Sequence, residues 1–479
     1  MRQPLVSSTL LKRTLSSLAP QAPKPSIDIK SIRLQPQIYS ENCVRRNYPT
    51  LRDHSFKIVA ASEKKKSVQA KAQPLRRKSN GIEADIARLR PPVNGEKDGN
   101  ESIRQKLKAE ASGIKDQLRR FEDEDHTLEA EIQALAVELP NLTSQDTPLG
   151  DEPRRLCYGN EHLLGSAVQN STWKDHVTLA KAEEFDLVDF ESAACATGRG
   201  WYFLKNEAVR LENALVAYAL DVAAKHGFIL QMPPSMVHGY MVEACGFRPR
   251  DKNEENQIYK ILQSERDAGR SDLNLAATAE ILFAASKANT TILEHELPLR
   301  VAGQSRCFRA EAGARGTDTK GLYRVHEFTK VEMFTWCREA DAAASFDKML
   351  EIQQEILTNL GLLFQVIEMP AHDLGASAYR KIDIEAWFPS RKARNGGWGE
   401  VTSLSSCNDY QTRRLATRVK LSNGKGLEFP YTINGTAMAV PRVLAAVLEL
   451  GWNEREDVIR IPEVLWPYMG GRRVIEKKR

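Results

Sequence analysis

The sequence has seven cysteines but no CxxC pair, which removes the usual ligand spacing of a zinc site. Their odd number and wide spacing also argue against a disulfide framework, so we expect reduced, buried thiols and no zinc. No apolar run is long enough to span a bilayer, and no membrane insertion is expected.

The common phosphate-binding loops are missing as well. The chain has no GxxxxGK[ST] motif, and no GxGxxG follows a strand pattern. Any nucleotide would therefore have to be held by arginines on an antiparallel sheet.

Acidic residues are scarce at the start of the chain. Residues 1–80 contain 17 Lys/Arg against 4 Asp/Glu, a net charge of +13, so the remainder carries −8 to give the total of +5. Residues 1–27 have no acid at all, and their leucines can share one helical face between serines and basic residues. This pattern predicts a mitochondrial transit peptide. An ordinary disordered tail is the alternative.

The most informative stretch that is present runs from Cys307 to Phe334. It predicts two strands joined by a glycine-rich turn at 312–321. In the second strand, expected from Leu322 onward, one face would carry Arg324, His326, Phe328, Lys330 and Glu332. A core strand carries such a face only where it lines a polar cleft. A face with cations, an aromatic ring and carboxylates suits the binding of a nucleotide and an amino acid. The alternative interpretation is an outer face of the sheet exposed to solvent.

A heptad pattern dominates residues 101–139. Its seam comprises Ile103, Leu107, Ala111, Ile114, Leu118, Phe121, Asp125, Leu128, Ile132, Leu135 and Leu139. Only Asp125 breaks the apolar character, and Pro140 ends the helix. Residues 57–90 would supply the partner helix of an antiparallel hairpin, although Pro74 lies inside them. Such an arm can form a dimer or grip a long polymer, and the pattern does not choose between these.

Two short segments each allow two interpretations. Thr278 and Glu280 could hold an α-ammonium group, or Thr278 could be a helix N-cap. Glu400 and Ser403 offer oxygen ligands suited to Mg²⁺, or they belong to a hydroxyl-rich edge strand.

A third segment, residues 432–450, is predicted as a small-residue turn that enters an apolar helix, with Pro441 in the first helical turn. Arg442 follows at the helix start, where the helix dipole mildly disfavours a cation. Its position there suggests a use, because a guanidinium can stack on a base.

Beyond residue 197, helices alternate with short strands without regular βαβ units, which predicts an antiparallel sheet with helices on one side. Residues 140–190 look irregular. The motifs FRAE, GLYRVHEFTKVE, TAE, EVTS and the final NGT with AVPR resemble those of class II aminoacyl-tRNA synthetases, and their order resembles seryl-tRNA synthetases in particular. The resemblance covers nearly the whole chain after the first 27 residues and favours a mitochondrial, fungal-type member.

The resemblance implies an α+β fold with a class II antiparallel β-sheet catalytic domain flanked by helices, preceded by an N-terminal helical coiled-coil arm. The implied domains are a transit peptide (1–27), a tRNA-binding coiled-coil domain (28–145), a linker or docking segment (146–196) and a catalytic domain (197–479). The implied activity is serine–tRNA ligase, in which ATP activates L-serine as the adenylate before transfer to tRNA(Ser). The implied setting is a homodimer in the mitochondrial matrix, with a cytosolic pool left open. The alternative is an inactive paralogue that binds tRNA in a regulatory role.

Residue roles also follow from the resemblance. The implied serine site consists of Thr278, Glu280, Arg309, Glu332, Asn434 and Thr436, with Glu332 accepting the serine hydroxyl. The implied ATP site consists of Arg309, Glu311, Val325, His326, Glu327, Phe328, Glu400, Val401, Thr402, Ser403 and Arg442. Arg309, Glu400 and Arg442 are the implied catalytic residues, and Glu400 and Ser403 the implied Mg²⁺ ligands. Glu327 departs from the family pattern, which has Gln there, and is expected to add negative charge near the nucleotide.

Overall fold

The computed structural model describes residues 22–89, 100–165, 173–181, 185–247, 257–264, 271–311, 321–422, 424 and 426–477. Two compact units make up the chain, Ile27–Leu142 on the one hand and Met1–Ser26 with Thr143–Arg479 on the other. Most of the expected transit peptide, the tip of the hairpin at 90–99 and the glycine-rich turn at 312–320 lie outside the described residues. Among the described helices, none is both long and apolar enough to cross a membrane.

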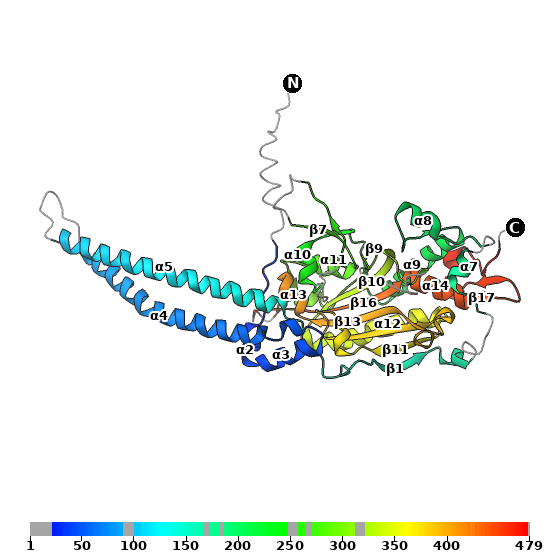
Figure 1. The fold of residues 1–479 in the computed structure, drawn as a ribbon, viewed down its shortest axis with the longest axis horizontal. Helices are drawn as coiled ribbons and strands as arrows, with labels where there is room; N and C mark the ends of the chain where they lie inside the picture. Colours follow the sequence, from blue (N-terminus) through cyan, green and yellow to red (C-terminus); the bar gives the residue numbers. More distant parts are fainter. Residues whose placement is uncertain are drawn as a thin grey trace, which may run out of the picture. The chain divides into compact units, whose positions relative to one another are not determined.

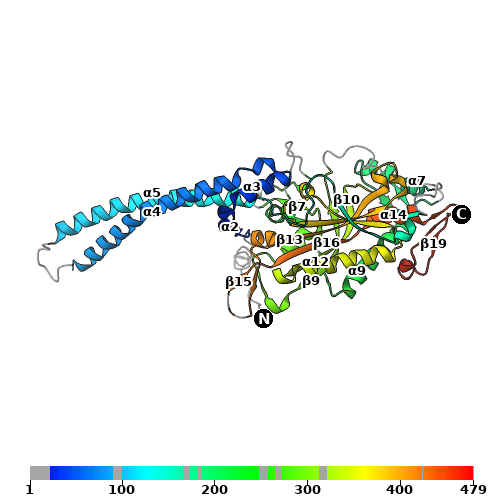
Figure 2. The ribbon, with the colours of Figure 1, turned by 90° about the horizontal axis from the view of Figure 1, so that it is seen from below.

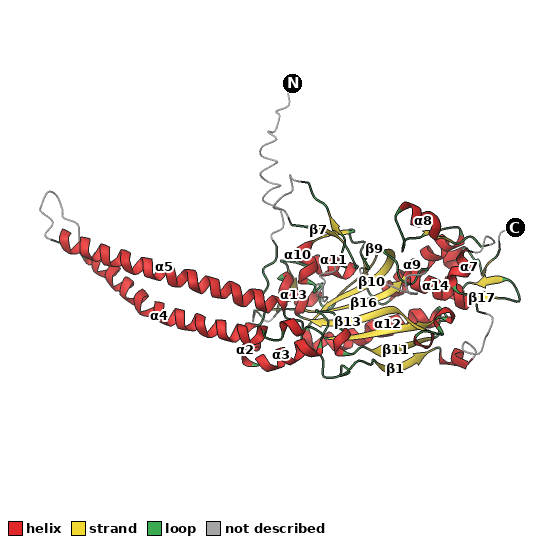
Figure 3. Ribbon diagram, viewed as in Figure 1, coloured by secondary structure: helices red, strands yellow, loops and turns green. Residues whose placement is uncertain are grey.

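The first unit is helical. It contains α2 (Ile29–Leu34), α3 (Pro36–Arg45), α4 (His54–Arg88) and α5 (Glu101–Glu138), and the two long helices run side by side as an antiparallel hairpin (Figures 1 and 3). The predicted seam of α5 faces α4, because Leu128 and Ile132 are buried in one cluster with Ile58 and Val68. The coiled-coil arm expected from the heptad pattern is confirmed.

Two exceptions to the hairpin pattern have local explanations. Asp125, the polar seam residue, accepts a hydrogen bond from Gln69 Nε2 at 2.8 Å and lies 3.9 Å from Lys65 Nζ, so the facing helix satisfies it. Pro74 is exposed and lies inside α4, which remains helical on both sides of it. The missing backbone hydrogen bond is tolerated because packing against α5 holds the opposite face.

The second unit is built on an eight-stranded sheet in the order β1-β11-β12-β13-β16-β10-β9-β4. Neighbouring strands pair antiparallel except for β4 with β9. In chain order the strands are β1 (Arg154–Gly159), β4 (Ile229–Leu230), β9 (Leu299–Phe308), β10 (Glu327–Cys337), β11 (Phe364–Glu368), β12 (Arg380–Trp387), β13 (Trp398–Asn408) and β16 (Tyr431–Ala439). The predicted α+β class with a largely antiparallel sheet is confirmed.

Smaller elements surround this sheet. The short sheets contain β2 (Val188–Asp189), β3 (Phe203–Leu204), β5 (Met236–His238), β6 (Lys260–Ile261), β7 (Leu273–Leu275), β8 (Thr291–Leu293), β14 (Arg418–Lys420), β15 (Leu427–Glu428), β17 (Trp452–Asn453), β18 (Val458–Arg460) and β19 (Val474–Ile475). The helices are α7 (His176–Lys181), α8 (Phe190–Ala196), α9 (Glu207–Lys225), α10 (Gly239–Ala244), α11 (Ala279–Ala285), α12 (Ala342–Asn359), α13 (Tyr410–Leu415) and α14 (Val440–Gly451).

The two faces of the sheet have different covers. Helices α9, α12 and α14 lie on one face of the sheet (Figure 2). They cover the main core, which includes Val331 and Met333 of β10. On the other face, the short helices α10, α11 and α13 pack over a second cluster that includes Phe334 and Trp336. The sequence had predicted helices on one side of the sheet, but helices cover parts of both faces. The start of β10 carries polar side chains on this second face, where a ligand could bind.

The central strands begin and end elsewhere than predicted. β10 starts at Glu327, whereas residues 321–326 form turns and bends that only approach the sheet. β9 ends at Phe308, so Arg309 and Glu311 lie on the connection that follows it. The alternation of side-chain character continues through residues 321–326 although their backbone forms turns and bends, which explains the error.

Three further expectations are corrected. Residues 432–439, predicted as a turn, belong to β16, where a Cβ on Gly435 would lie 2.7 Å from Met349 Sδ of α12. Small residues are therefore needed there for close helix packing. The segment 140–190, expected to be irregular, supplies the edge strand β1, which pairs with β11. β13 lies between β12 and β16, so the edge-strand alternative for Glu400 and Ser403 is wrong.

Candidate active site

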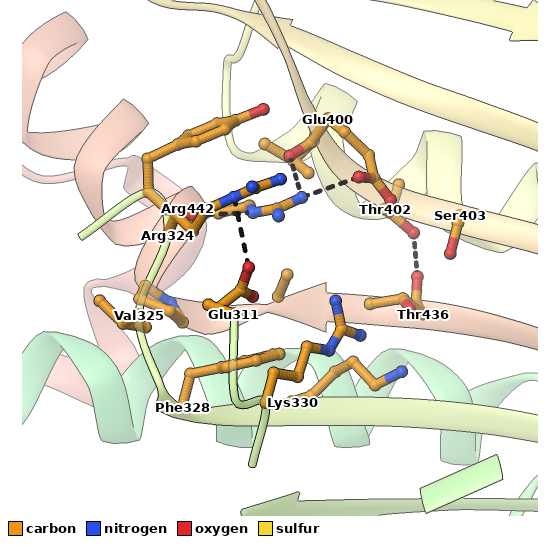
Figure 4. A pocket seen from close by; sticks show the side chains of 15 residues that line it. Glu311, Arg324, Val325, Phe328, Lys330, Glu400, Thr402, Ser403, Thr436 and Arg442 are labelled. Atoms are coloured by element: carbon orange, nitrogen blue, oxygen red, sulfur yellow. Dashed lines mark hydrogen bonds and ion pairs between the residues drawn. The ribbon is translucent and has the colours of Figure 1, made fainter. Parts of the chain in front are cut away.

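A pocket opens over the polar ends of β10, β13 and β16 (Figure 4). Its walls also include the connections at 309–311 and 323–325 and the first turn of α14. The lining residues are Arg309, Glu311, Tyr323, Arg324, Val325, Phe328, Lys330, Glu400, Val401, Thr402, Ser403, Thr436, Ala439, Pro441 and Arg442. Ten of the residues implied by the sequence resemblance are in this set, although they come from four separate parts of the chain.

An arginine–glutamate pair forms one wall of the pocket. Arg442 Nη1 donates to Glu400 Oε2 at 2.9 Å and to the Glu400 carbonyl at 3.0 Å, while its Nε donates to the Tyr323 carbonyl at 3.1 Å (Figure 4). The Glu400 carboxylate offsets the unfavourable position of a cation at a helix N-terminus. Partial burial alone would raise the pKa of Glu400, but Arg442 and Lys381 outweigh it and lower the pKa to about 2. Glu400 is therefore ionised at neutral pH.

A second cation lies across the pocket from this pair. The Arg309 guanidinium is 5.2 Å from the centre of the Phe328 ring, and the Arg309 N–H donates to the His326 carbonyl at 2.8 Å. Glu311 forms an ion pair with Arg324 at 3.5 Å (Figure 4). A flat, anionic ligand could bind here, because the Phe328 ring lies near the guanidinium groups of Arg309 and Arg324.

The inner end of the pocket is a buried polar cluster. Lys330, which is 6% exposed, donates to Thr278 Oγ1 at 2.7 Å and forms a short ion pair with Glu332. Thr436 Oγ1 lies 3.5 Å from Glu332 Oε2. Thr278 also caps α11 by accepting from the Glu280 N–H at 3.3 Å, so the helix N-cap interpretation of this segment is confirmed.

Glu280 is buried behind this cluster and accepts a hydrogen bond from Gln411 Nε2 at 2.7 Å. Burial, with the nearby negative charge of Glu332, raises the pKa of Glu280 to about 7. Near neutral pH this group therefore exchanges between neutral and charged forms.

Six of the implied site residues do not line the pocket. Thr278, Glu280 and Glu332 belong to the buried cluster just described, and Asn434 is buried on β16, two residues before Thr436. His326 turns outward and stacks on Trp201, with ring centres 5.7 Å apart.

Glu327, the departure from the family pattern, faces away from the pocket. Its carboxylate accepts from Arg306 Nε at 2.8 Å, and Arg306 also bonds Thr329, whose hydroxyl donates to Glu212 of α9. The extra negative charge of Glu327 is thus neutralised on the face of the sheet that α9 covers.

Several residues at the site were missed from sequence. Lys330 was placed on the polar face of the strand but was given no role. Lys381 and Asp383 of β12 form a 2.6 Å ion pair next to Glu400, and burial raises the pKa of the Asp383 carboxyl above its ordinary value. Gln353 of α12 donates to the Ser403 and Thr436 carbonyls and so ties β13 to β16. Only the three-dimensional pairing of distant segments reveals such residues.

The donors at the pocket fit a magnesium ion that also binds phosphate. Glu400 is ionised and Ser403 adds a hydroxyl on the same strand, and oxygen ligands of this kind are those that Mg²⁺ prefers. Among the described residues, no three His, Cys, Asp or Glu side chains gather to hold a metal by themselves. Phosphate oxygens and water would have to complete the coordination.

This sheet and pocket define a class II aminoacyl-tRNA synthetase. Residues 259–450 match the tRNA synthetase class II core domain (G, H, P, S and T), and residues 27–143 match the seryl-tRNA synthetase N-terminal domain. The chain belongs to the seryl-tRNA synthetase family, and its activity is that of an ATP-dependent serine–tRNA ligase.

The similarity extends over most of the chain. The mitochondrial serine–tRNA ligase of Saccharomyces cerevisiae is 38% identical over 82% of this chain and 84% of the relative. The serine–tRNA ligase of Rhodopirellula baltica is also 38% identical, over 93% of this chain and 98% of the relative. The crystal structure of seryl-tRNA synthetase from Pyrococcus horikoshii complexed with ATP has a TM-score of 0.82 and 30% identity, covering 95% of this chain and 100% of that one.

Proposed function

We propose that the pocket activates L-serine with ATP, and that its outer and inner ends divide the two substrates. The observation that carries this proposal is that the two ends of one pocket carry different kinds of side chain. Arg309, Arg442, Phe328 and Glu400 lie at the outer end, and the buried Lys330–Glu332 cluster lies at the inner end. The outer end suits a nucleotide triphosphate and the inner end suits a small zwitterion with a hydroxyl.

The reaction needs positioning and charge stabilisation more than proton transfer. A serine carboxylate oxygen forms a bond to the α-phosphorus in line with the bond to the β-phosphate oxygen, which breaks and releases pyrophosphate. Arg309 lines the pocket and would contact both the carboxylate and the α-phosphate, where its charge would stabilise the negative charge on the phosphoryl oxygens. A magnesium ion held by Glu400 and Ser403 would supply additional positive charge at the phosphates.

Further contacts fix the two substrates. Phe328 and Arg442 would enclose the adenine ring, and Glu311 would accept from its amino group. Glu332 would accept the serine hydroxyl beside Thr436, and Thr278 with Glu280 would hold the ammonium group. Asn434 is buried on β16, two residues before Thr436. In the second step a hydroxyl of the terminal tRNA nucleotide attacks the serine carbonyl, and AMP leaves.

ATP–pyrophosphate exchange with each amino acid in turn tests the proposed function. Exchange that depends on serine is expected, with threonine and proline giving none. An absence of serine-dependent exchange would favour the alternative of a tRNA-binding paralogue without activity. Magnesium titration of the exchange reaction, compared between the native chain and Glu400→Gln, tests the metal site, since the variant should need a higher Mg²⁺ concentration.

The raised pKa of Glu280 predicts a pH-dependent affinity for serine. If the Glu280 carboxylate holds the substrate ammonium, the KM for serine should rise about tenfold as pH falls from 8 to 6, because the carboxyl becomes neutral below about 7. The KM for ATP serves as the internal reference and should change little. In Glu280→Gln the pH dependence of the serine KM should disappear, and a native profile in that variant would exclude the role.

The same shift has a consequence for stability. The pKa of Glu280 in the folded chain lies above its ordinary value of 4.5, so the folded state binds the proton more tightly than the unfolded state. Its contribution to stability is present at low pH and is lost as pH rises from about 4.5 through about 7.

We also propose that the α4–α5 hairpin binds tRNA(Ser). Helix α4 carries nine Lys/Arg against three Asp/Glu, a charge balance that suits a phosphate backbone. Removing residues 57–138 should abolish aminoacylation while ATP–pyrophosphate exchange continues. Loss of both reactions in a folded truncation would count against a separate tRNA-binding role. This deletion removes the hairpin alone and leaves in place residues 28–56 of the proposed tRNA-binding domain, the proposed linker and the proposed catalytic domain, which begins near residue 197.

A homodimer is the proposed assembly. The edge strand β4 exposes Ile229 and Leu230 to 56% and 49%, and the following Met232 is 81% exposed. An apolar sheet edge of this kind invites pairing with another chain. Light scattering should give the mass of a dimer for the native chain and of a monomer for Leu230→Lys, and a native monomer would refute the assembly.

The mitochondrial matrix is the proposed location, with a cytosolic pool as a second outcome. The acid-free segment 1–27 and the mitochondrial relative support it, although bacterial relatives are equally similar. Reporter fusions with and without residues 1–27 test the proposal. An unchanged cytosolic signal would refute it.

A further inference from the structure

Helix α14 carries a buried acid, Glu449, that the reaction above does not use. Glu449 is fully buried near the C-terminal end of the helix, seven residues after Arg442. Seven residues make about two helical turns, so both side chains lie on the same side of α14. Arg442 lines the pocket, whereas Glu449 does not.

Glu449 accepts hydrogen bonds from two separate segments. Its Oε1 atom accepts from the His176 N–H at 3.2 Å and from Ser390 Oγ at 2.7 Å, and it lies 2.6 Å from His176 Nδ1. Its Oε2 atom accepts from the Ser390 N–H at 3.0 Å. A group surrounded by donors in this way acts as a carboxylate, which has acceptors only.

The second contact of His176 fixes its tautomer. The Leu322 N–H donates to His176 Nε2 at 3.1 Å, so Nε2 has no proton and acts as the acceptor. Nδ1 therefore carries the proton and donates it to Glu449. His176 is 6% exposed and Leu322 is fully buried, so no solvent competes for this contact.

Leu322 is the start of the connection that forms a wall of the pocket. The next three residues, 323–325, all line it. Arg442 holds the same connection from the other side through the Tyr323 carbonyl. Gly321 packs so tightly on the imidazole that an added Cβ would lie 2.3 Å from His176 Nε2, and its φ of +76° also favours glycine.

We infer that the His176–Glu449 pair is a positioning unit for the nucleotide end of the pocket. It holds the Leu322 amide and thereby sets the placement of residues 323–325 against Arg442. This inference rests on the proposed function, since it assigns ATP to that end of the site. His176 and Glu449 do not touch the substrate and act only through the connection.

Two substitutions separate the two contacts of His176. In His176→Asn, the side-chain amide can replace Nδ1 toward Glu449, but no acceptor reaches the buried Leu322 amide. In His176→Gln, the side-chain carbonyl can reach the Nε2 position and accept from Leu322, while Glu449 keeps its three other donors. His226→Asn is the matched control, because His226, which follows α9, also lies 2.6 Å from a carboxylate, that of Glu355 of α12, and does not line the pocket.

We expect His176→Asn to weaken ATP binding about tenfold in calorimetry and to raise the KM for ATP in exchange by the same factor, as for one buried hydrogen bond. The KM for serine should stay within about twofold, and His176→Gln and His226→Asn should resemble the native chain. Equal losses in both His176 variants, a parallel rise of the serine KM, or unchanged ATP binding in His176→Asn would overturn the inference. A native chain that binds ATP without exchange would refute the proposed function alone, while one that binds no ATP would refute both.

Discussion

Arg442→Ala is expected to lower serine-dependent ATP–pyrophosphate exchange by about 10³-fold, the range seen when one charge-stabilising group is removed from an active site. Arg442 contacts both Glu400 and the Tyr323 carbonyl, so its loss affects two walls of the pocket together. Without this cation, the pKa of Glu400 would rise, because Arg442 is the largest of the influences that lower it.

Two further variants separate charge from geometry at this position. Arg442→Lys keeps the positive charge but cannot contact Glu400 and Tyr323 with a planar fork, so an intermediate loss is expected. Arg460→Ala removes an exposed arginine that pairs with Glu456 and should leave exchange unchanged. Exchange within tenfold of the native rate in Arg442→Ala would show that the arginine only supports the fold.

Glu332→Gln is the second substitution with a large expected effect, and it should act on stability and specificity together. Glu332 is 1% exposed and pairs with the buried Lys330, so removing its charge leaves a buried ammonium without its partner. Breaking one side of a buried pair costs about 3–5 kcal/mol. A lower melting temperature is therefore expected, along with loss of serine activation.

A double substitution distinguishes these two effects. Lys330→Met combined with Glu332→Gln removes both charges, so much of the lost stability should return. Serine activation should not return, because the hydroxyl has lost its charged acceptor. Sites that hydrogen-bond a substrate hydroxyl reject the analogue without it by about 10⁴-fold, so the ratio of serine to alanine exchange is the measurement to follow. A double variant that recovers serine preference would remove Glu332 from the specificity site.

The sequence predicted which side chains gather at the pocket better than it predicted the helices and strands that carry them. Phe328, Lys330 and Glu332 alternate on β10 as expected, because a two-residue period survives any shift of the strand ends. The start of β10 and the strand character of 432–439 were not predicted. Both depend on what packs against the segment, as Met349 does against Gly435, and local propensity does not contain that information.

The largest omissions are contacts between distant segments. His176 and Glu449 are 273 positions apart, and neither belongs to a motif with a recognisable spacing. Glu327 shows the converse, since its departure from the family pattern predicted a negative charge near the nucleotide, whereas its carboxylate pairs with Arg306 on the side away from the pocket. A period assigns a side chain to a face, but only the folded chain shows which charge it meets there.

Asp125 gives the arm a fixed alignment, with a consequence for how its length could change. Its hydrogen bond from Gln69 pairs one specific position of α5 with one position of α4. A seven-residue insertion in one helix alone would force a choice between this contact and the apolar seam. Paired insertions beyond the contact would keep both and lengthen the arm by about 10 Å per heptad. The aspartate therefore fixes the register of the two helices. Beyond it, the length of the hairpin can change in whole heptads without disturbing its base.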